Sequence, residues 1–135
     1  MRIFLDANIL FSASKNQGAM AHLLDESLKR QHILVVDGYV LAEAEKNLAA
    51  KFPEGLPELT ARTRSCTVAG TPRNALRFSD LIPLLPEKNL PVLVSAIEAD
   101  CDVLVTGDKK HFGELYGRLL QGVKIVSPAM LIKML

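Results

Sequence analysis

Short apolar runs alternate along this chain with longer segments in which apolar residues recur at the spacing of an amphipathic helix. The runs predict five strands, at residues 2–6, 33–36, 65–69, 103–106 and 123–126, with the third at a sheet edge. The segments between them predict helices at residues 16–30, 39–51, 56–63, 75–84, 91–100 and 111–120, and a last helix from residue 128. The alternation predicts an α/β fold, with a parallel sheet of about five strands flanked by helices on both faces.

Turn and capping residues mark the ends of several of these elements. Asp37-Gly38 ends the second strand, and a breaker cluster at residues 52–57 ends the helix that follows it. Pro91 suits the first turn of a helix, where its missing N–H leaves no hydrogen bond unmade. Ser127 is expected to cap the last helix, with Pro128 at its first position.

Composition favours one folded domain that spans residues 1–135. Hydrophobic residues make up 49% of the 135 and charged residues 23%, which is typical of a globular domain. No apolar run approaches the roughly 18 residues of a membrane span. The first residues enter a strand pattern at once, without the regions of a secretory signal, so we expect an unprocessed cytoplasmic protein without membrane contact.

Cysteine content and net charge exclude two further classes. Cys66 and Cys101 lie far apart in no paired spacing, which favours two buried free thiols over a zinc site or a disulfide framework. The formal net charge is only +1, so any binding of nucleic acid must come from a local patch.

Acidic residues follow two of the predicted strands. Asp6 comes directly after the first strand, and Asp108 follows the strand at residues 103–106. Ligands of open α/β sheets bind outside the carboxyl ends of the strands, so these two carboxylates predict a shared acidic site for a divalent metal ion. Glu43 lies early enough in its helix to reach the same edge, and Asn89 lies just before the helix that begins near Pro91.

The order and separation of these motifs resemble the PIN domains, metal-dependent ribonucleases that include the VapC-type toxins of prokaryotic toxin–antitoxin pairs. The resemblance covers nearly the whole chain, through residues 4–10, 40–43, 90–98, 99–109 and 125–129. It implies a cluster of four acids that binds Mg²⁺ or Mn²⁺ at the carboxyl edge of the sheet.

Carried over position by position, the resemblance makes Asp6 the first acid, Glu43 the second and Asp108 the last. Asn89 stands at the position of the third acid, and an amide offers a carbonyl ligand but no negative charge. The resemblance therefore implies weaker metal binding than in a four-acid site, unless Glu87 replaces the missing carboxylate.

The expected mechanism is metal-assisted hydrolysis of RNA phosphodiester bonds. Divalent ions held by Asp6 and Asp108 would polarise the phosphate, activate a water and offset charge on the leaving oxygen. Glu43 would act as a third ligand or as a base that orients the water. Asn8 is expected to fix the geometry of the Asp6 carboxylate, and Ser12 or Thr106 to do the same.

Each candidate also has a purely structural explanation. Asp6 could cap the following turn, and residues 106–108 could be only a tight turn. Glu43 could pair with Lys46 on a solvated helix face. Asn89 could be a helix N-cap, which we regard as no less probable than a ligand.

Binding of RNA is expected to depend on phosphate contacts, because the chain has no Trp and no interleaved aromatic residues. Lys109 and Lys110 follow Asp108 directly, and they and Lys15 are the candidate cations. The three histidines are expected to be structural or surface residues: His22, His32 and His111.

Three functions compete. The first is a PIN-type ribonuclease, the toxin of a toxin–antitoxin pair, with RNA as substrate. The second is a weakened PIN-like domain that binds RNA or a protein without cutting. The third is a phosphoryl-transfer domain, but the chain lacks a receiver's acidic doublet, and Asn8 stands where a dehalogenase-like phosphatase needs its second Asp. By resemblance, the partners are a small antitoxin protein and a second copy of the chain, with the helices after the first two strands available for a homodimer.

Overall fold

Six strands form the centre of the computed structural model, which describes residues 1–70 and 75–135. In space they run in the order β3-β2-β1-β4-β6-β5. Their bounds are β1 (Arg2–Leu5), β2 (Ile33–Asp37), β3 (Thr67–Ala69), β4 (Val103–Val105), β5 (Leu119–Leu120) and β6 (Val123–Val126). All neighbours pair in parallel except β5 and β6, so the predicted parallel sheet is confirmed and a short antiparallel edge strand is added to it.

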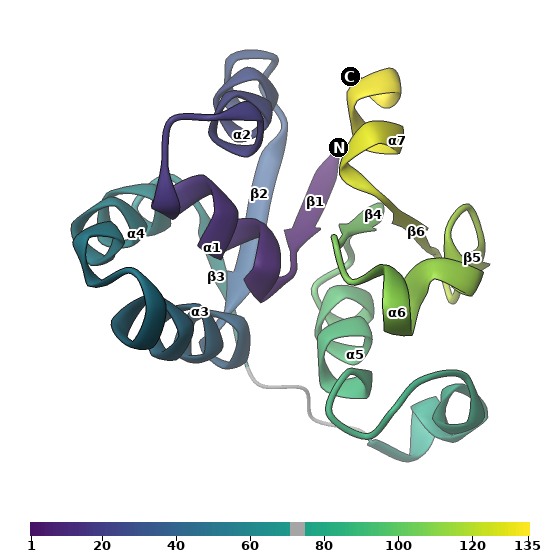
Figure 1. The fold of residues 1–135 in the computed structure, drawn as a ribbon. Helices are drawn as coiled ribbons and strands as arrows, with labels where there is room; N and C mark the ends of the chain where they lie inside the picture. Colours follow the sequence, from purple (N-terminus) through teal and green to yellow (C-terminus); the bar gives the residue numbers. More distant parts are fainter. Residues whose placement is uncertain (71–74) are drawn as a thin grey trace.

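Helices cover the sheet, as Figure 1 shows. One group packs together beside β1 and β2: α1 (Ala7–Lys15), α2 (Ala19–Lys29), α3 (Gly38–Lys51), η1 (Pro53–Gly55) and α4 (Leu56–Thr63). The others follow later in the chain: η2 (Ala75–Leu84), α5 (Leu90–Glu98), α6 (Lys109–Phe112), η3 (Gly113–Leu115) and α7 (Pro128–Met134). Ile3 and Phe4 point to opposite faces of β1, and both are 0% exposed, so both faces of the central strand are covered.

The register of the central strands brings two loops together at one edge. Leu5 of β1 lies beside Val105 of β4, and the Asp6 N–H donates to the Val105 carbonyl over 3.1 Å. Because the two strands are parallel and in step, Asp6 and Thr106 leave the sheet side by side. The residues that follow each strand therefore face the same space.

The first helix was not predicted. The sequence analysis assigned no element between residues 6 and 16, yet α1 begins one residue after Asp6. Asp6 is its N-cap and accepts a hydrogen bond from the Ala7 N–H, so the strand ends where the helix begins. The predicted helix at residues 16–30 is present as α2, which begins after Gly18.

The predicted helix at residues 111–120 is wrong. Only α6 and the 3-10 turn η3 are helical there, and the chain then forms β5. Gln121 and Gly122, which connect β5 to β6, have positive φ of 47° and 88°, and this turn reverses the chain so that β5 pairs with β6. Residues 75–84, predicted as a helix, form the 3-10 helix η2, with Pro83 inside it.

Two other predictions can be compared directly with the structure. Cys66 is half-buried and Cys101 is buried, and both are free thiols, as the sequence predicts; burial raises the pKa of each to about 11. Among the described residues, none of the helices has the length and apolar content needed to cross a membrane.

Candidate active site

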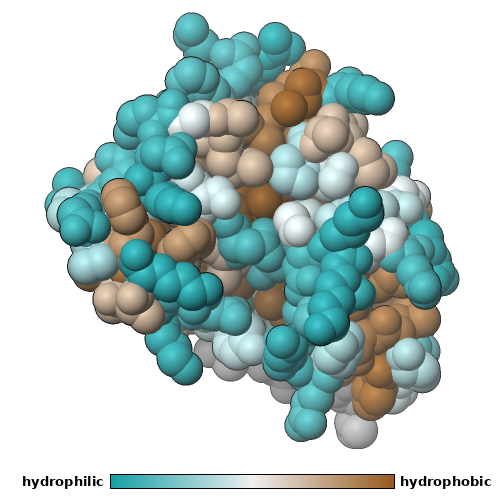
Figure 2. All heavy atoms as spheres, in the orientation of Figure 1, coloured by the Kyte–Doolittle hydropathy of each residue, from teal (hydrophilic) through white to brown (hydrophobic). Residues whose placement is uncertain are grey.

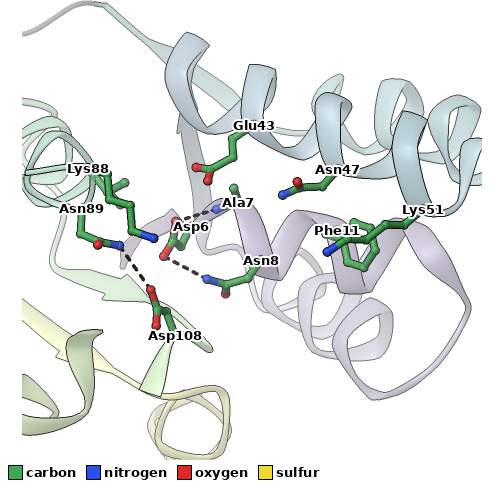
Figure 3. A pocket seen from close by; sticks show the side chains of 11 residues that line it. Asp6, Ala7, Asn8, Phe11, Glu43, Asn47, Lys51, Lys88, Asn89 and Asp108 are labelled. Carbon is green, nitrogen blue, oxygen red and sulfur yellow. Dashed lines mark hydrogen bonds between the residues drawn. The ribbon is translucent and has the colours of Figure 1, made fainter. Parts of the chain in front are cut away.

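A pocket of about 220 Å³ opens at the carboxyl edge of the sheet (Figure 3). Four of the residues that line it are the predicted acids and their amide substitute: Asp6, Glu43, Asn89 and Asp108. They come from the start of α1, from α3, from the turn before α5 and from the turn before α6. The structure thus brings together residues that lie up to 102 positions apart in the sequence.

Asp6 is held on several sides. Its side chain is only 4% exposed, and Oδ1 accepts from the Ala7 N–H at 2.7 Å. Oδ2 accepts from Thr106 Oγ1 at 2.7 Å and from Asn8 Nδ2 at 3.1 Å. Burial raises the pKa of the carboxyl above its ordinary value, although these hydrogen bonds oppose the rise. Asp6 is therefore both a helix cap and a fixed carboxylate at the pocket.

Thr106 and Asn8 connect the two acidic loops. The Thr106 hydroxyl, which is buried, donates to Asp6 and accepts from the Asp108 N–H at 3.1 Å. Asn8 Oδ1 accepts from the Gly107 N–H at 2.8 Å. A Cβ at Gly107 would lie 3.3 Å from Asn8 Oδ1, so glycine allows this close approach. The orienting contacts predicted for Asn8 and Thr106 are present, whereas Ser12 does not line the pocket.

Asp108 makes a different set of contacts. Oδ1 accepts from the His111 N–H at 3.1 Å, which caps α6, and His111 Nδ1 lies 2.8 Å from Oδ2. Burial acts to raise the pKa of Asp108, but the hydrogen bonds from His111 outweigh it, and the net shift is downward. His111 was expected to be a structural or surface residue, and the structure places it against a candidate ligand.

Asn89 occupies the N-cap position of α5 without acting as a cap through its side chain. Its Nδ2 donates instead to Asp108 Oδ2 at 3.3 Å. The side chain is 8% exposed, and Oδ1 is buried without a hydrogen-bond partner in the described part of the chain. A buried, unpartnered carbonyl oxygen costs free energy unless a donor or a cation reaches it.

Glu43 lies on the opposite wall, on an exposed face of α3, and Figure 3 shows its carboxylate pointing toward Asp6 and Ala7. Within the described residues it forms no ion pair with Lys46, which was its structural alternative. Asp37 is a further acid at this edge, but its buried side chain caps α3 and accepts from Ser95, and it does not line the pocket.

The donors around the pocket fit a hard divalent cation in type. Asp6, Glu43 and Asp108 offer carboxylate oxygens, and Asn89 offers its unpartnered carbonyl oxygen. The acidic side chains are not tightly grouped, however. In the described ranges 1–70 and 75–135, no three side chains of His, Cys, Asp or Glu are close enough together to hold a metal ion as a group. An ion held by Asp6 and Asp108 would complete its coordination with waters, the Asn89 carbonyl or Glu43.

Four polar or aromatic residues that line the pocket were not predicted as site residues, and the aliphatic Ala7 and Val92 line it as well. Phe11, Asn47 and Lys51 form the end of the pocket away from the sheet, with Lys51 Nζ 6.0 Å from the centre of the Phe11 ring. Lys88 extends into the pocket between Asn89 and Asp6 in Figure 3. The helical spacing of residues 43, 47 and 51 was the available signal for the α3 residues.

The cations that the sequence analysis did name lie elsewhere. Lys15, Lys109 and Lys110 are exposed and do not line this pocket.

The fold of this chain is similar to that of proteins of known structure. The chain is similar to the solved structure of VapBC2 from Rickettsia felis bound to a DNA fragment from their promoter, with a TM-score of 0.71 and 15% identity over 94% of this chain and 98% of that chain. It is also similar to the structure of VapBC-1 from nontypeable Haemophilus influenzae, with a TM-score of 0.64 and 16% identity over 96% of this chain and 99% of that chain. At these identities the likeness shows a shared fold. No curated protein matches the sequence significantly. The PIN domain family matches residues 2–110, which is most of the chain, and this protein therefore belongs to the PIN domain family.

Proposed function

We propose that this chain is a metal-dependent ribonuclease that hydrolyses RNA phosphodiester bonds. The observation that carries the proposal is the convergence of Asp6, Glu43, Asn89 and Asp108 on one pocket at the carboxyl edge of a PIN domain. The family assignment also argues against a receiver or a dehalogenase-like phosphatase.

Mg²⁺ or Mn²⁺ would be held by the carboxylates of Asp6 and Asp108, with Glu43 or the Asn89 carbonyl as a further ligand. Such an ion would supply Lewis acidity to the phosphate and lower the pKa of the attacking water. Asn8 and Thr106 keep the Asp6 carboxylate in one orientation through their hydrogen bonds. The chain's own contribution is therefore a fixed orientation of the Asp6 carboxylate.

Proton transfer is assigned to Glu43. Its carboxylate is exposed and points into the pocket, so it is free to accept a proton from the attacking water. In the hydrolysis the water oxygen bonds to phosphorus, the bond from phosphorus to the leaving ribose oxygen breaks, and that oxygen takes up a proton. Water is the only co-reactant.

The likeness to VapBC structures supports a more specific role, the toxin of a toxin–antitoxin pair acting on cytoplasmic RNA. Its partners would be a small antitoxin and a second copy of the chain. Most apolar positions of α2 and α3 are buried within the chain, whereas Met20, Leu28 and Leu41 are only partly buried and Tyr39 is exposed, so a dimer surface there would use these residues. The large exposed hydrophobic residues come from several elements: Ile33, Tyr39, Val68, Ile82, Leu119 and Ile132. On the described face seen in Figure 2 the hydrophobic patches are separate, and most of the surface is hydrophilic.

A second candidate function is binding of RNA or a protein without cleavage. Asn89 favours it, because the site has an amide where the family resemblance implies an acid.

Cleavage of a mixed pool of single-stranded and structured RNA tests both candidates. The purified protein is assayed with Mg²⁺, with Mn²⁺ and with chelator, together with Asp6→Asn and Asn89→Asp. We expect cutting that requires metal and is lost in Asp6→Asn. Asn89→Asp adds a fourth carboxylate and is expected to tighten Mn²⁺ binding about tenfold, measured by calorimetry.

The control for Asn89→Asp is Asn16→Asp, the same change at an exposed position outside the pocket. Activity only in Asn89→Asp would indicate a degenerate site on a nuclease scaffold, which favours the second candidate. Absence of both cutting and metal binding in every variant would reject the nuclease proposal.

A further inference from the structure

Lys88 places a positive charge inside the acidic pocket. It lies in the turn directly before Asn89, and Figure 3 shows its side chain extending between Asn89 and Asp6, with the ammonium directed toward the Asp6 side of the pocket. Within the described residues Lys88 forms no ion pair, so its ammonium is available to a ligand.

The backbone that presents Lys88 is fixed from across the pocket mouth. The Tyr39 hydroxyl, at the start of α3, donates to the Lys88 carbonyl at 2.8 Å. This bond joins α3, which carries Glu43, to the turn that carries Lys88 and Asn89. Because this hydrogen bond fixes the Lys88 backbone, the Lys88 side chain extends into the pocket from a defined position.

The formal charges of the pocket suit an anion once a metal is present. Asp6, Glu43 and Asp108 contribute three negative charges, and Lys51 and Lys88 contribute two positive ones. The lining residues therefore have a net formal charge of −1, and one divalent cation would change it to +1. A pocket with this charge would attract a phosphodiester, which has a single negative charge. The same pocket with an acid at position 89 and no lysine at 88 would hold one divalent ion and remain negative.

We propose that Lys88 is a substrate-binding residue of this site, whose ammonium contacts the RNA phosphate at the acidic end of the pocket and supplies positive charge there. The inference rests on the proposed ribonuclease function, which it deepens. Lysine is a common phosphate ligand because its three N–H donors and its charge can meet an oxygen from many directions. The amide at position 89 and the lysine beside it both make the pocket less negative than a fourth acid would, which favours a phosphate.

Binding of a short mixed-sequence single-stranded RNA with cleavage-resistant phosphorothioate linkages, measured with Mg²⁺ present, tests the inference by affinity rather than by cleavage. Lys88→Gln is expected to weaken binding about tenfold, the effect of losing one charge-assisted hydrogen bond. The slope of log K against log salt is expected to fall in magnitude by about 0.7, the value for one phosphate contact on a single strand. Lys88→Arg keeps the charge and should retain most of the affinity.

The matched control is Lys133→Gln, the same charge change on an exposed residue of α7 outside the pocket. Unchanged RNA affinity and salt slope in Lys88→Gln would overturn the inference. So would faster cleavage in Lys88→Gln, because it would mean that the lysine blocks the acids rather than binding substrate. If wild type binds RNA through Lys88 but cuts nothing, the ribonuclease proposal fails and the assignment of Lys88 as a phosphate ligand remains.

Discussion

Two aspartates that face the same pocket have opposite pKa shifts. Asp6 is buried at the start of α1, and burial raises its pKa despite three hydrogen bonds. Asp108 is less buried, and its hydrogen bonds from His111 lower its pKa. The environment thus holds Asp108 ionised over a wider pH range than Asp6, although both are aspartates at strand ends.

The raised pKa of Asp6 predicts a definite pH dependence of stability. The carboxyl of Asp6 has its ordinary pKa of about 3.8 in the unfolded chain and a higher pKa in the folded protein. As pH rises above about 3.8, Asp6 therefore ionises first in the unfolded chain. Its contribution to the free energy of unfolding falls over this range and becomes constant once pH exceeds the pKa of the folded protein. Asp6→Asn cannot ionise. We therefore expect the stability of Asp6→Asn relative to wild type to increase across this window and then to level off, measured by denaturant unfolding with chelator present.

Glu54→Gln is the control for that series, because it replaces an exposed carboxylate on η1 with an amide. It separates the effect of burial from the loss of one negative charge. A difference between Asp6→Asn and wild type that stays constant from about pH 3 to pH 7 would show that the Asp6 pKa is not raised by folding.

For individual residues, the sequence predicted which side chains would lie together at the site, but not which hydrogen bonds they would form. Asp6 and Asp108 followed from their places after strands, and Asn89 from its place before a helix. The contact of His111 with Asp108 depends on how α6 turns, and the entry of Lys88 depends on a bond from Tyr39, 49 residues earlier. The Tyr39 bond has no local sequence signal, whereas His111 lies only three residues after the aspartate that caps α6.

Two elements that carry site residues are joined by one buried polar contact. Ser95 of α5 is 2% exposed and donates its hydroxyl to Asp37 Oδ2, while Asp37 Oδ1 accepts from the Val40 N–H and caps α3. The contact holds the helix that follows Asn89 against the strand end from which the helix of Glu43 begins. It therefore helps to set the width of the pocket.

Ser95→Ala is expected to destabilise the fold by about 1–3 kcal/mol, because it leaves a buried carboxylate oxygen without its donor. Unfolding in urea with unchanged m-value measures the loss. Ser12→Ala is the matched control: Ser12 lies on α1, outside the pocket, and its substitution should change stability by less. Equal stability of the two variants would mean that the contact between α5 and Asp37 contributes little.

Element types could be predicted where apolar periodicity was long and failed where it was short or interrupted. The helix α3, with Val40, Ala44 and Leu48 buried at helical spacing, was predicted with nearly its observed bounds. The nine-residue helix α1 was missed because it begins at once after a strand, with no loop between them. Residues 111–120 have enough apolar residues for a helix, but Gly113 and Gly117 divide them into a turn and a short strand.

At the scale of the whole molecule, function is concentrated at the carboxyl edge of a parallel sheet. The sheet order puts β1 beside β4, and this pairing brings the loops after them together. The alternation of strands and helices was sufficient to predict the shared carboxyl edge, since parallel connections return each strand to the same edge, but it did not predict that β1 lies beside β4. The small antiparallel strand β5 is at the far end of the sheet and does not affect it.

The distribution of charge over the molecule predicts how strongly salt affects RNA binding. Net charge is only +1, and two lysines, Lys51 and Lys88, line the pocket. If these two make the phosphate contacts, log K for single-stranded RNA should fall with log salt at a slope of about −1.4, from about −0.7 per contact. Titrations of a cleavage-resistant RNA over a range of salt concentrations, at constant Mg²⁺, measure the slope.

The alternative is a wider basic surface that includes Lys15, Lys109 and Lys110, which the sequence analysis named and the structure places outside the pocket. Replacing these three with Gln should leave the slope unchanged if the pocket alone binds phosphate, whereas Lys51→Gln should reduce it. A slope several times steeper than about −1.4 that the triple replacement abolishes would locate RNA binding beside Asp108, outside the pocket. The RNA would then reach the acids along α6 rather than across α3.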